Sequence, residues 1–125
     1  MIERYTNPEM GNIWSDQAKY QTWLDVEIAA CEANCKLGKI PQSAMETIRT
    51  KARFKPERIL EIEEEVRHDV IAFLTNVNEY VGDAGRYIHV GMTSSDVLDT
   101  GLALQLKSSV KLLRKELLLL EDAIR

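Results

Sequence analysis

The last third of the sequence carries one apolar repeat, and its length limits the folds open to the chain. From Thr93 onward, leucines and a valine recur every three or four residues, with no stop signal before Arg125. They are Leu98, Leu102, Leu106, Val110, Leu113, Leu117 and Leu120. This spacing is typical of one continuous amphipathic helix. About 30 residues at a rise of about 1.5 Å form a rod of roughly 45 Å, whereas a compact chain of 125 residues would be only about 35 Å across.

The predicted rod therefore extends beyond the rest of the chain, with an apolar face that nothing else in the sequence can cover. A large exposed apolar surface indicates missing partners. Two explanations stay open. Either the sequence is part of a longer protein, which we favour, or this helix assembles with other helices in a bundle.

Residues 1–92 are also predicted to be helical, with no convincing strand. Residues 1–9 are expected to be irregular, and 10–14 to form a short turn. The expected helices then cover 16–37, 41–52, 56–66 and 70–80, followed by a turn at 82–85 and an extended piece at 86–92. Ser15 as an N-cap, Gly38 as a stop and prolines in two first turns mark the boundaries. We predict an all-α fold in which an N-terminal helical domain, residues 1–92, precedes the long helix over 93–125.

The composition excludes several classes of function. Hydrophobic residues make up 45% and charged residues 29% of the chain, which is typical of a soluble globular protein. The net charge of −4 gives no electrostatic reason to bind nucleic acid or an anionic membrane. No apolar run approaches the roughly 20 residues of a membrane span, and the N-terminus lacks the apolar core of a secretory signal. Cys31 and Cys35 are expected to be reduced thiols, so a cytoplasmic location is predicted.

The chain contains two histidines, and the residues around each of them are unusual. His68 stands between Arg67 and Asp69, a cation and an anion that can tune and orient an imidazole. His89 lies on the short connector before the long helix. A lone histidine is more often structural or solvated than catalytic, so both interpretations stay open for each of them.

The start of the long helix is the strongest physical candidate for a binding site. Thr93 or Ser94 can serve as the N-cap, and Asp96 lies in the first turn. The first amides of a helix are unsatisfied donors at the positive end of its dipole, and they suit a carboxylate or a phosphate. The sequence leaves two interpretations equally open: a plain helix cap, or a cap that also binds an anion.

Arg4 and Tyr5 lie on the N-terminal arm, where a guanidinium could bind phosphate or simply face solvent. The sequence contains no Gly-rich phosphate loop, no metal-ligand cluster and no nucleophile motif. The residues alone therefore predict a helical module with a possible anion site, and they name no reaction.

Three stretches form a more specific pattern: IERYTNPEM at 2–10, RHDVIAF at 67–73 and HVGMTSSDVLDT at 89–100. Together with WLDVEIAACEA at 23–33, they closely resemble the adenylosuccinate lyase family of the fumarase–aspartase superfamily. The TSSD segment alone would indicate only the superfamily. The resemblance covers essentially the whole chain.

The resemblance implies a homotetramer whose central bundle takes long helices from every subunit, with residues 93–125 as the start of that domain. It implies cleavage of adenylosuccinate to AMP and fumarate, and the same elimination on SAICAR, which yields AICAR. These small molecules are the expected ligands. No metal and no organic cofactor is expected.

The resemblance also implies roles for individual residues. Thr93 and Ser94 match positions that bind a carboxylate of the succinyl group, and Arg4 and Tyr5 match positions that hold the nucleotide phosphate. The tripeptide Arg67, His68 and Asp69 matches substrate-contacting positions. His68 and His89 match histidines that support catalysis, and whether His68 transfers a proton or only orients the substrate stays open. The principal acid and base of the family lie beyond Arg125, so the 125-residue chain alone is expected to be inactive.

Two rival interpretations remain. One is another lyase of the superfamily, such as argininosuccinate lyase or a cycloisomerase. The other is a non-catalytic helical assembly module, in which the TSSD segment is only a helix cap.

Overall fold

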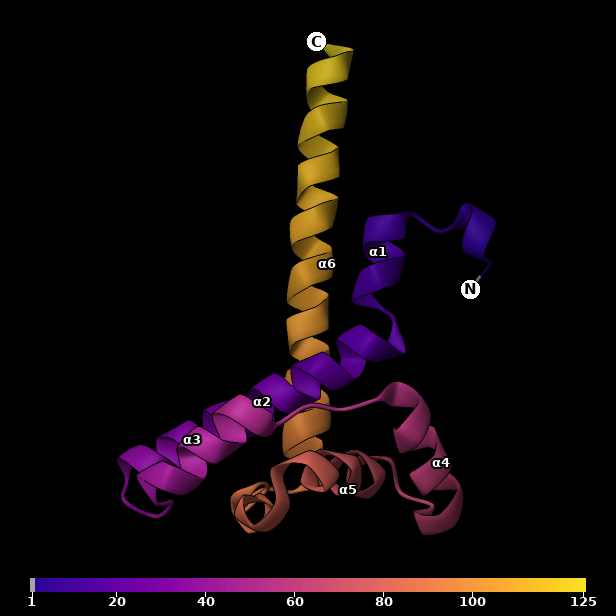
Figure 1. Ribbon diagram of the computed structural model, residues 1–125. Coiled ribbons are helices and arrows are strands. Elements are labelled where there is room, and N and C mark those ends of the chain that lie inside the picture. Colours follow the sequence, from indigo (N-terminus) through magenta and orange to yellow (C-terminus); the bar gives the residue numbers. More distant parts are fainter. Residues whose placement is uncertain (1) are drawn as a thin grey trace.

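The computed structural model describes residues 2–125, with only the backbone of Glu3, and the regular elements of this part of the chain are all helices (Figure 1). In chain order the elements are the 3-10 helix η1 (Glu3–Tyr5), α1 (Pro8–Ile13), α2 (Asp16–Lys36), α3 (Gln42–Lys51), α4 (Pro56–Val66), α5 (Asp69–Val81), the 3-10 helix η2 (Gly82–Tyr87) and α6 (Ser94–Ile124). No strand occurs in the described residues, so the all-α prediction is confirmed. None of the described helices combines the length and the hydrophobicity that crossing a membrane requires.

Helices α2 to α5 form a body around the lower part of α6, and the rest of α6 extends away to the C-terminus (Figure 1). The 31 residues of α6 correspond to about 46 Å at the usual rise per residue. The predicted protruding rod is therefore confirmed.

An aromatic cluster forms the centre of the body. The rings of Tyr20 on α2 and Phe73 on α5 stack with centroids 6.0 Å apart. Trp23 meets Phe73 edge-on at 5.5 Å. Val97 on α6 is fully buried in the same core. Since large apolar side chains supply most of the burial free energy, this cluster fixes α2, α5 and the first turn of α6 against one another.

Helix α6 has two faces of different chemistry. The face toward the body carries small or polar residues at four-residue spacing, Gly101, Gln105 and Ser109, all of them buried. A Cβ on Gly101 would lie 2.8 Å from Trp23 Cδ1, so α2 crosses α6 at close range. Gln105 Nε2 donates to the carbonyl of Ile13 at 2.8 Å.

The opposite face of α6 carries the apolar repeat. Six of its seven predicted members are between 47% and 65% exposed, namely Leu102, Leu106, Val110, Leu113, Leu117 and Leu120. The predicted uncovered stripe is confirmed for these six. Leu98 differs, because it packs against the core of the body.

Most predicted helix ends are correct, and two segments need correction. Ser15 accepts from the Ala18 amide at 3.1 Å, and Gly38 has a positive φ of 73° just after α2. Residues 2–9 are not irregular: they contain η1 and the start of α1, where Asn7 caps the helix by accepting from the Met10 amide at 3.1 Å. Met1 lies outside the described residues.

The segment 86–92 is not extended as predicted. Arg86 and Tyr87 complete η2, and His89 then turns with a φ of 68°. The physical reason is the amide of Ile88, which donates to the carbonyl of Gly85 at 3.0 Å and closes a turn there.

Candidate functional site

The predicted RHD stretch forms the corner between α4 and α5. Arg67 ends α4 in the left-handed region, with a φ of 54°. His68 is the N-cap of α5, and its Nδ1 accepts from the amide of Ile71 at 3.4 Å. Asp69 Oδ1 accepts from the amide of Val70 at 2.7 Å and lies 3.5 Å from His68 Nδ1. Of the two charged neighbours expected to orient His68, Asp69 alone lies within reach in the structure.

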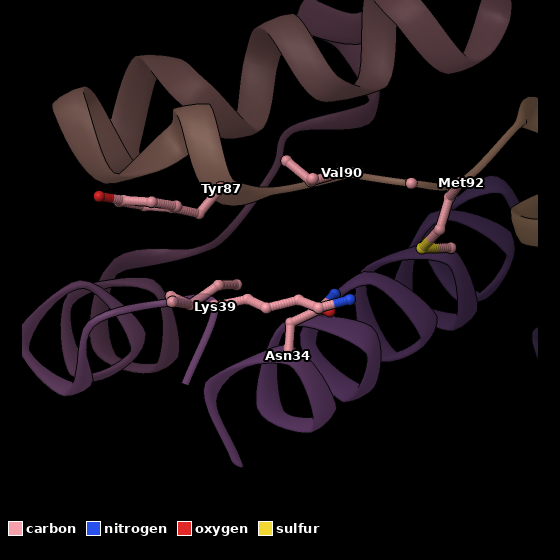
Figure 2. Close-up of a pocket in the computed structure, with 7 residues that line it drawn as sticks. Asn34, Lys39, Tyr87, Val90 and Met92 are labelled. Atoms are coloured by element: carbon pink, nitrogen blue, oxygen red, sulfur yellow. The ribbon is translucent and has the colours of Figure 1, made fainter. Parts of the chain in front are cut away.

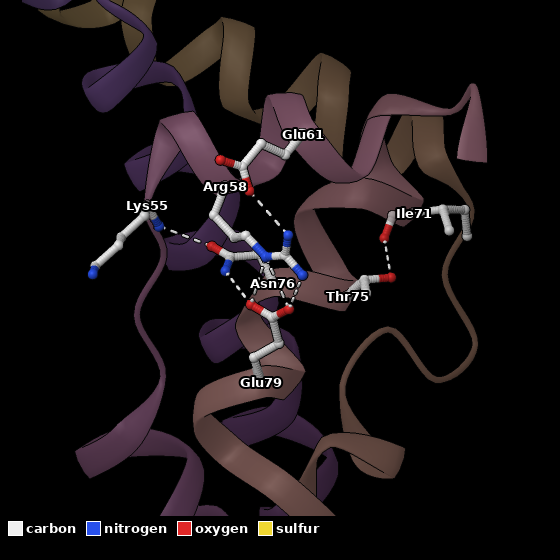
Figure 3. Close-up of polar contacts among 7 residues, drawn as sticks. All are labelled: Lys55, Arg58, Glu61, Ile71, Thr75, Asn76 and Glu79. Carbon is white, nitrogen blue, oxygen red and sulfur yellow. Dashed lines mark hydrogen bonds and ion pairs between the residues drawn. The ribbon is translucent and has the colours of Figure 1, made fainter. Parts of the chain in front are cut away.

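A polar network fastens the far end of the α4–α5 hairpin that carries this corner (Figure 3). Arg58 on α4 donates to Glu79 on α5 through Nη2 at 2.8 Å and Nε at 3.1 Å. Asn76 bonds to Glu79 Oε2 at 2.9 Å and accepts from the amide of Lys55 at 2.8 Å. The hydrogen bonds from Arg58 lower the pKa of Glu79. The network joins the start of α4 to the end of α5. It therefore helps to hold the exposed RHD corner, which lies between the end of α4 and the start of α5.

The second predicted histidine has a partner far away in the sequence. His89 Nδ1 lies 2.5 Å from Oε1 of Glu27, which is on α2 and only 1% exposed. Burial raises the pKa of Glu27, and the hydrogen bond from His89 opposes that rise. His89 itself has a positive φ of 68° and Gly91 has one of 78°, so the connector makes two left-handed turns before α6.

Sequence reasoning missed Glu27, although a signal for it exists. The residue stands four positions after Trp23 and four before Cys31, on the buried face of α2. A carboxylate on the apolar stripe of a helix needs a buried partner. That pattern could have marked Glu27, but not the identity of its partner.

The start of α6 is capped as predicted. Thr93 is the N-cap, and Asp96 Oδ2 accepts from the Thr93 amide at 2.8 Å. The Asp96 amide donates to the Thr93 carbonyl at 3.0 Å. Ser94 is half-buried and Ser95 exposed. The predicted cap is confirmed, and the additional anion site stays a prediction that rests on the first amides of α6 and on the hydroxyls of Thr93 and Ser94.

The N-terminal arm lies apart from these two corners (Figure 1). Tyr5 is 73% exposed, and the Arg4 guanidinium lies over its ring at 4.8 Å. No hydrogen bond or ion pair among the described residues joins the arm, the RHD corner and the start of α6.

Two hollows lie near these residues. A cavity of about 290 Å³ opens between α2 and the 87–92 connector, and its lining comprises Asn34, Lys39, Ile40, Tyr87, Val90, Gly91 and Met92 (Figure 2). It contains none of the predicted site residues. Arg67 borders an open groove with Leu60, Glu63 and Glu64. Among residues 2–125 no group of three His, Cys, Asp or Glu side chains could hold a metal ion.

Comparisons with known proteins agree on one family. A family model described as lyase matches residues 3–125. The chain is 70% identical over 125 residues to an adenylosuccinate lyase of Synechocystis sp.. It is 49% identical over 120 residues, 94% of this chain, to an adenylosuccinate lyase of Aquifex aeolicus. The chain spans 29% and 28% of the length of these two relatives.

A solved structure shows the same fold. The 3-carboxy-cis,cis-muconate lactonizing enzyme from Pseudomonas putida superposes with a TM-score of 0.82 at 31% identity, over 90% of this chain and 27% of that one.

Proposed function

Because the chain belongs to the lyase family, whose model spans residues 3–125, we propose that it forms part of an enzyme that cleaves adenylosuccinate to AMP and fumarate. The same β-elimination of a C–N bond would convert SAICAR to AICAR and fumarate. The observation that carries the proposal is the 70% identity to an adenylosuccinate lyase along the entire chain. A role in purine nucleotide synthesis and a cytoplasmic location follow from this proposal.

The proposed reaction requires hydrogen-bond donors at the place where negative charge develops. A base removes a proton from the carbon beside a carboxylate, and an acid protonates the departing nitrogen as the C–N bond breaks. Charge builds up on that carboxylate in the transition state, so fixed donors there accelerate the reaction. Thr93 and Ser94, at the N-terminus of the 31-residue α6, supply hydroxyls and amides of this kind.

The other predicted residues take binding and supporting roles in the proposal. Arg4 and Tyr5 would hold the nucleotide phosphate, since a guanidinium binds phosphate in a bidentate manner. Arg67, His68 and Asp69 would contact the substrate from the α4–α5 corner. His68 and His89 would support catalysis by hydrogen bonding. The acid and base that move the protons would come from outside this chain, and no cofactor is required.

The proposed active site is shared between subunits. No hydrogen bond or ion pair among the described residues joins the arm, the RHD corner and the start of α6. The six exposed residues of the α6 stripe present an apolar face of the kind that helices bury in a bundle. We propose a homotetramer in which residues 1–92 form an outer domain and residues 93–125 begin the central bundle.

The test of the proposed function uses the full-length protein and two substrates. We expect release of fumarate and AMP from adenylosuccinate, followed by chromatography, and no cleavage of argininosuccinate. The 125-residue chain alone should release no fumarate. Cleavage of argininosuccinate instead would assign another lyase of the superfamily, whereas a folded tetramer that binds neither AMP nor fumarate would indicate an assembly module.

The Arg4→Ala variant tests the choice of substrate. Loss of a charge-assisted contact to the phosphate should weaken AMP binding by roughly 10-fold or more. Fumarate binding, which needs no phosphate contact, serves as the internal control in calorimetry. Unchanged AMP affinity would contradict the assignment of a nucleotide substrate.

A further inference from the structure

Glu27 is a buried carboxyl group with one polar partner. It lies on the apolar face of α2 and is 1% exposed, with Trp23 and Cys31 one turn away on either side. Its Oε1 lies 2.5 Å from His89 Nδ1, while Oε2 is buried with no hydrogen-bond partner among the described residues. Among the described residues, the polar contacts of the Glu27 side chain are therefore all with His89. The side-chain contact is with the imidazole ring.

This arrangement is unfavourable as a means of stabilising the fold. Burial raises the pKa of Glu27, which means that the charged carboxylate is disfavoured at this place. A well-packed apolar side chain of similar volume usually stabilises a core as well as a buried ion pair does, or better. The unpartnered Oε2 adds a further desolvation cost. We therefore look for the role of Glu27 in its effect on His89 rather than in the stability of the fold.

His89 is held at both its backbone and its ring. Its φ of 68° lies in the left-handed region, where a non-glycine residue persists only when surrounding contacts hold it. Its side chain is 20% exposed, so part of the ring reaches the surface beside the start of α6. When Glu27 is ionised, its carboxylate only accepts hydrogen bonds, so Nδ1 then donates to Glu27 and the acceptor position falls on Nε2. No described residue bonds to Nε2.

We propose that Glu27 is a positioning residue of the active site, which sets the ring orientation and the tautomer of His89 and thereby presents Nε2 as an acceptor to the substrate. The inference rests on the proposed lyase function, in which His89 contacts the substrate. The same logic governs metal-bound histidines, where a carboxylate on the second nitrogen fixes the ring and its tautomer. Here the substrate takes the place of the metal.

The test is a pair of substitutions at Glu27 in the full-length protein. In Glu27→Met the volume is kept and the carboxyl is removed, so the protein should fold with an unchanged or raised melting temperature. Its kcat on adenylosuccinate should nevertheless fall on the order of 10- to 100-fold, the usual effect of removing such a partner, with a smaller change in KM. In Glu27→Gln the amide oxygen can still accept from Nδ1, so a large part of kcat should return.

Gln105→Met is the matched control. Gln105 is also a buried polar residue, 6% exposed, and its side chain bonds to the backbone of Ile13 rather than to a histidine. Its kcat should stay near that of the unchanged protein. If Glu27→Met retains as much activity as Gln105→Met, or if Glu27→Gln is as impaired as Glu27→Met, the positioning role is wrong.

A crystal structure of Glu27→Met separates this inference from the proposed function. If the unchanged protein cleaves no adenylosuccinate, the lyase proposal fails. The ring of His89 then decides the positioning role without any kinetics. A ring that rotates or becomes disordered in Glu27→Met supports it, and a ring that stays in place overturns it.

Discussion

The two histidines of this chain lie at two corners that both contain a non-glycine residue with a positive φ. The corners differ in how exposed the histidine side chain is and in which residues it contacts. Arg67, just before His68, and His89 itself are the two non-glycine residues with positive φ in the described chain, at 54° and 68°. The side chain of His68 is 46% exposed, and its contacts are to Asp69 and Ile71. The side chain of His89 is 20% exposed and contacts a glutamate 62 positions away.

The difference teaches that one corner is held locally and the other by the tertiary fold. The His68 contacts lie within three residues and in water, where hydrogen bonds and ion pairs contribute little net free energy. The His89 contact is buried, where leaving one partner alone is costly. Substitutions at the two corners should therefore change the free energy of unfolding by different amounts.

The largest expected effect belongs to His89→Ala. The substitution leaves the Glu27 carboxyl buried without its one partner, which should lower the free energy of unfolding by about 3 kcal/mol. Urea unfolding followed by circular dichroism near neutral pH measures the loss.

The loss should also depend on pH. Burial raises the pKa of Glu27 from its ordinary 4.5, and removing His89 removes the contact that opposes this rise. A carboxyl whose folded pKa lies above its unfolded pKa stabilises the fold below the unfolded pKa, and that stability is lost as the pH rises through the folded pKa. The deficit of His89→Ala should therefore grow as the pH rises above 4.5, the ordinary pKa of the carboxyl. In the double variant with Glu27→Met this growth should disappear, and a deficit independent of pH in His89→Ala would contradict the buried-carboxyl explanation.

Glycine at the two left-handed positions should act in opposite directions. Arg67→Gly relieves a left-handed conformation that costs an L-residue about 1 kcal/mol or more, and Arg67 is exposed. The variant should gain about 1 kcal/mol of stability. His89→Gly gains the same relief but loses the contact with Glu27, so its net change should be a loss. Equal gains at both positions would show that the buried pair contributes nothing to stability.

Much of the fold could be predicted because helix signals are local. The Thr93 cap, the Gly38 stop and the three- to four-residue repeat of leucines all act within one or two turns, and each is correct in the structure. The same locality explains the errors. Asn7 and Pro8 are ordinary N-terminal signals, but the helix they begin has only six residues and shows no repeat.

The candidate site could be predicted only in its local parts. The TSSD cap and the RHD corner are contiguous in sequence, whereas the contact of Glu27 with His89 joins residues 62 positions apart. Spacing along one helix shows that Glu27 faces the core, and packing alone decides that His89 reaches it. The close approach of α2 to α6 at Gly101 is of the same kind, since a single glycine in a leucine-rich helix does not name the helix that crosses it. The substrate roles of Arg4, Tyr5, Arg67, Asp69, Thr93 and Ser94 stay predictions.

His68→Ala should have the smallest effect of the series. The hydrogen bond that it removes, from the Ile71 amide to Nδ1, is long at 3.4 Å and lies in an exposed place. Loss of a weak N-cap costs about 0.5 kcal/mol, or a decrease of roughly 2 °C in the melting temperature of a domain of this size. His68→Asn is the control, because asparagine is a better N-cap and should restore or exceed the original stability. Equal losses in the two alanine variants would mean that burial does not distinguish these corners, and the local explanation for His68 would have to be abandoned.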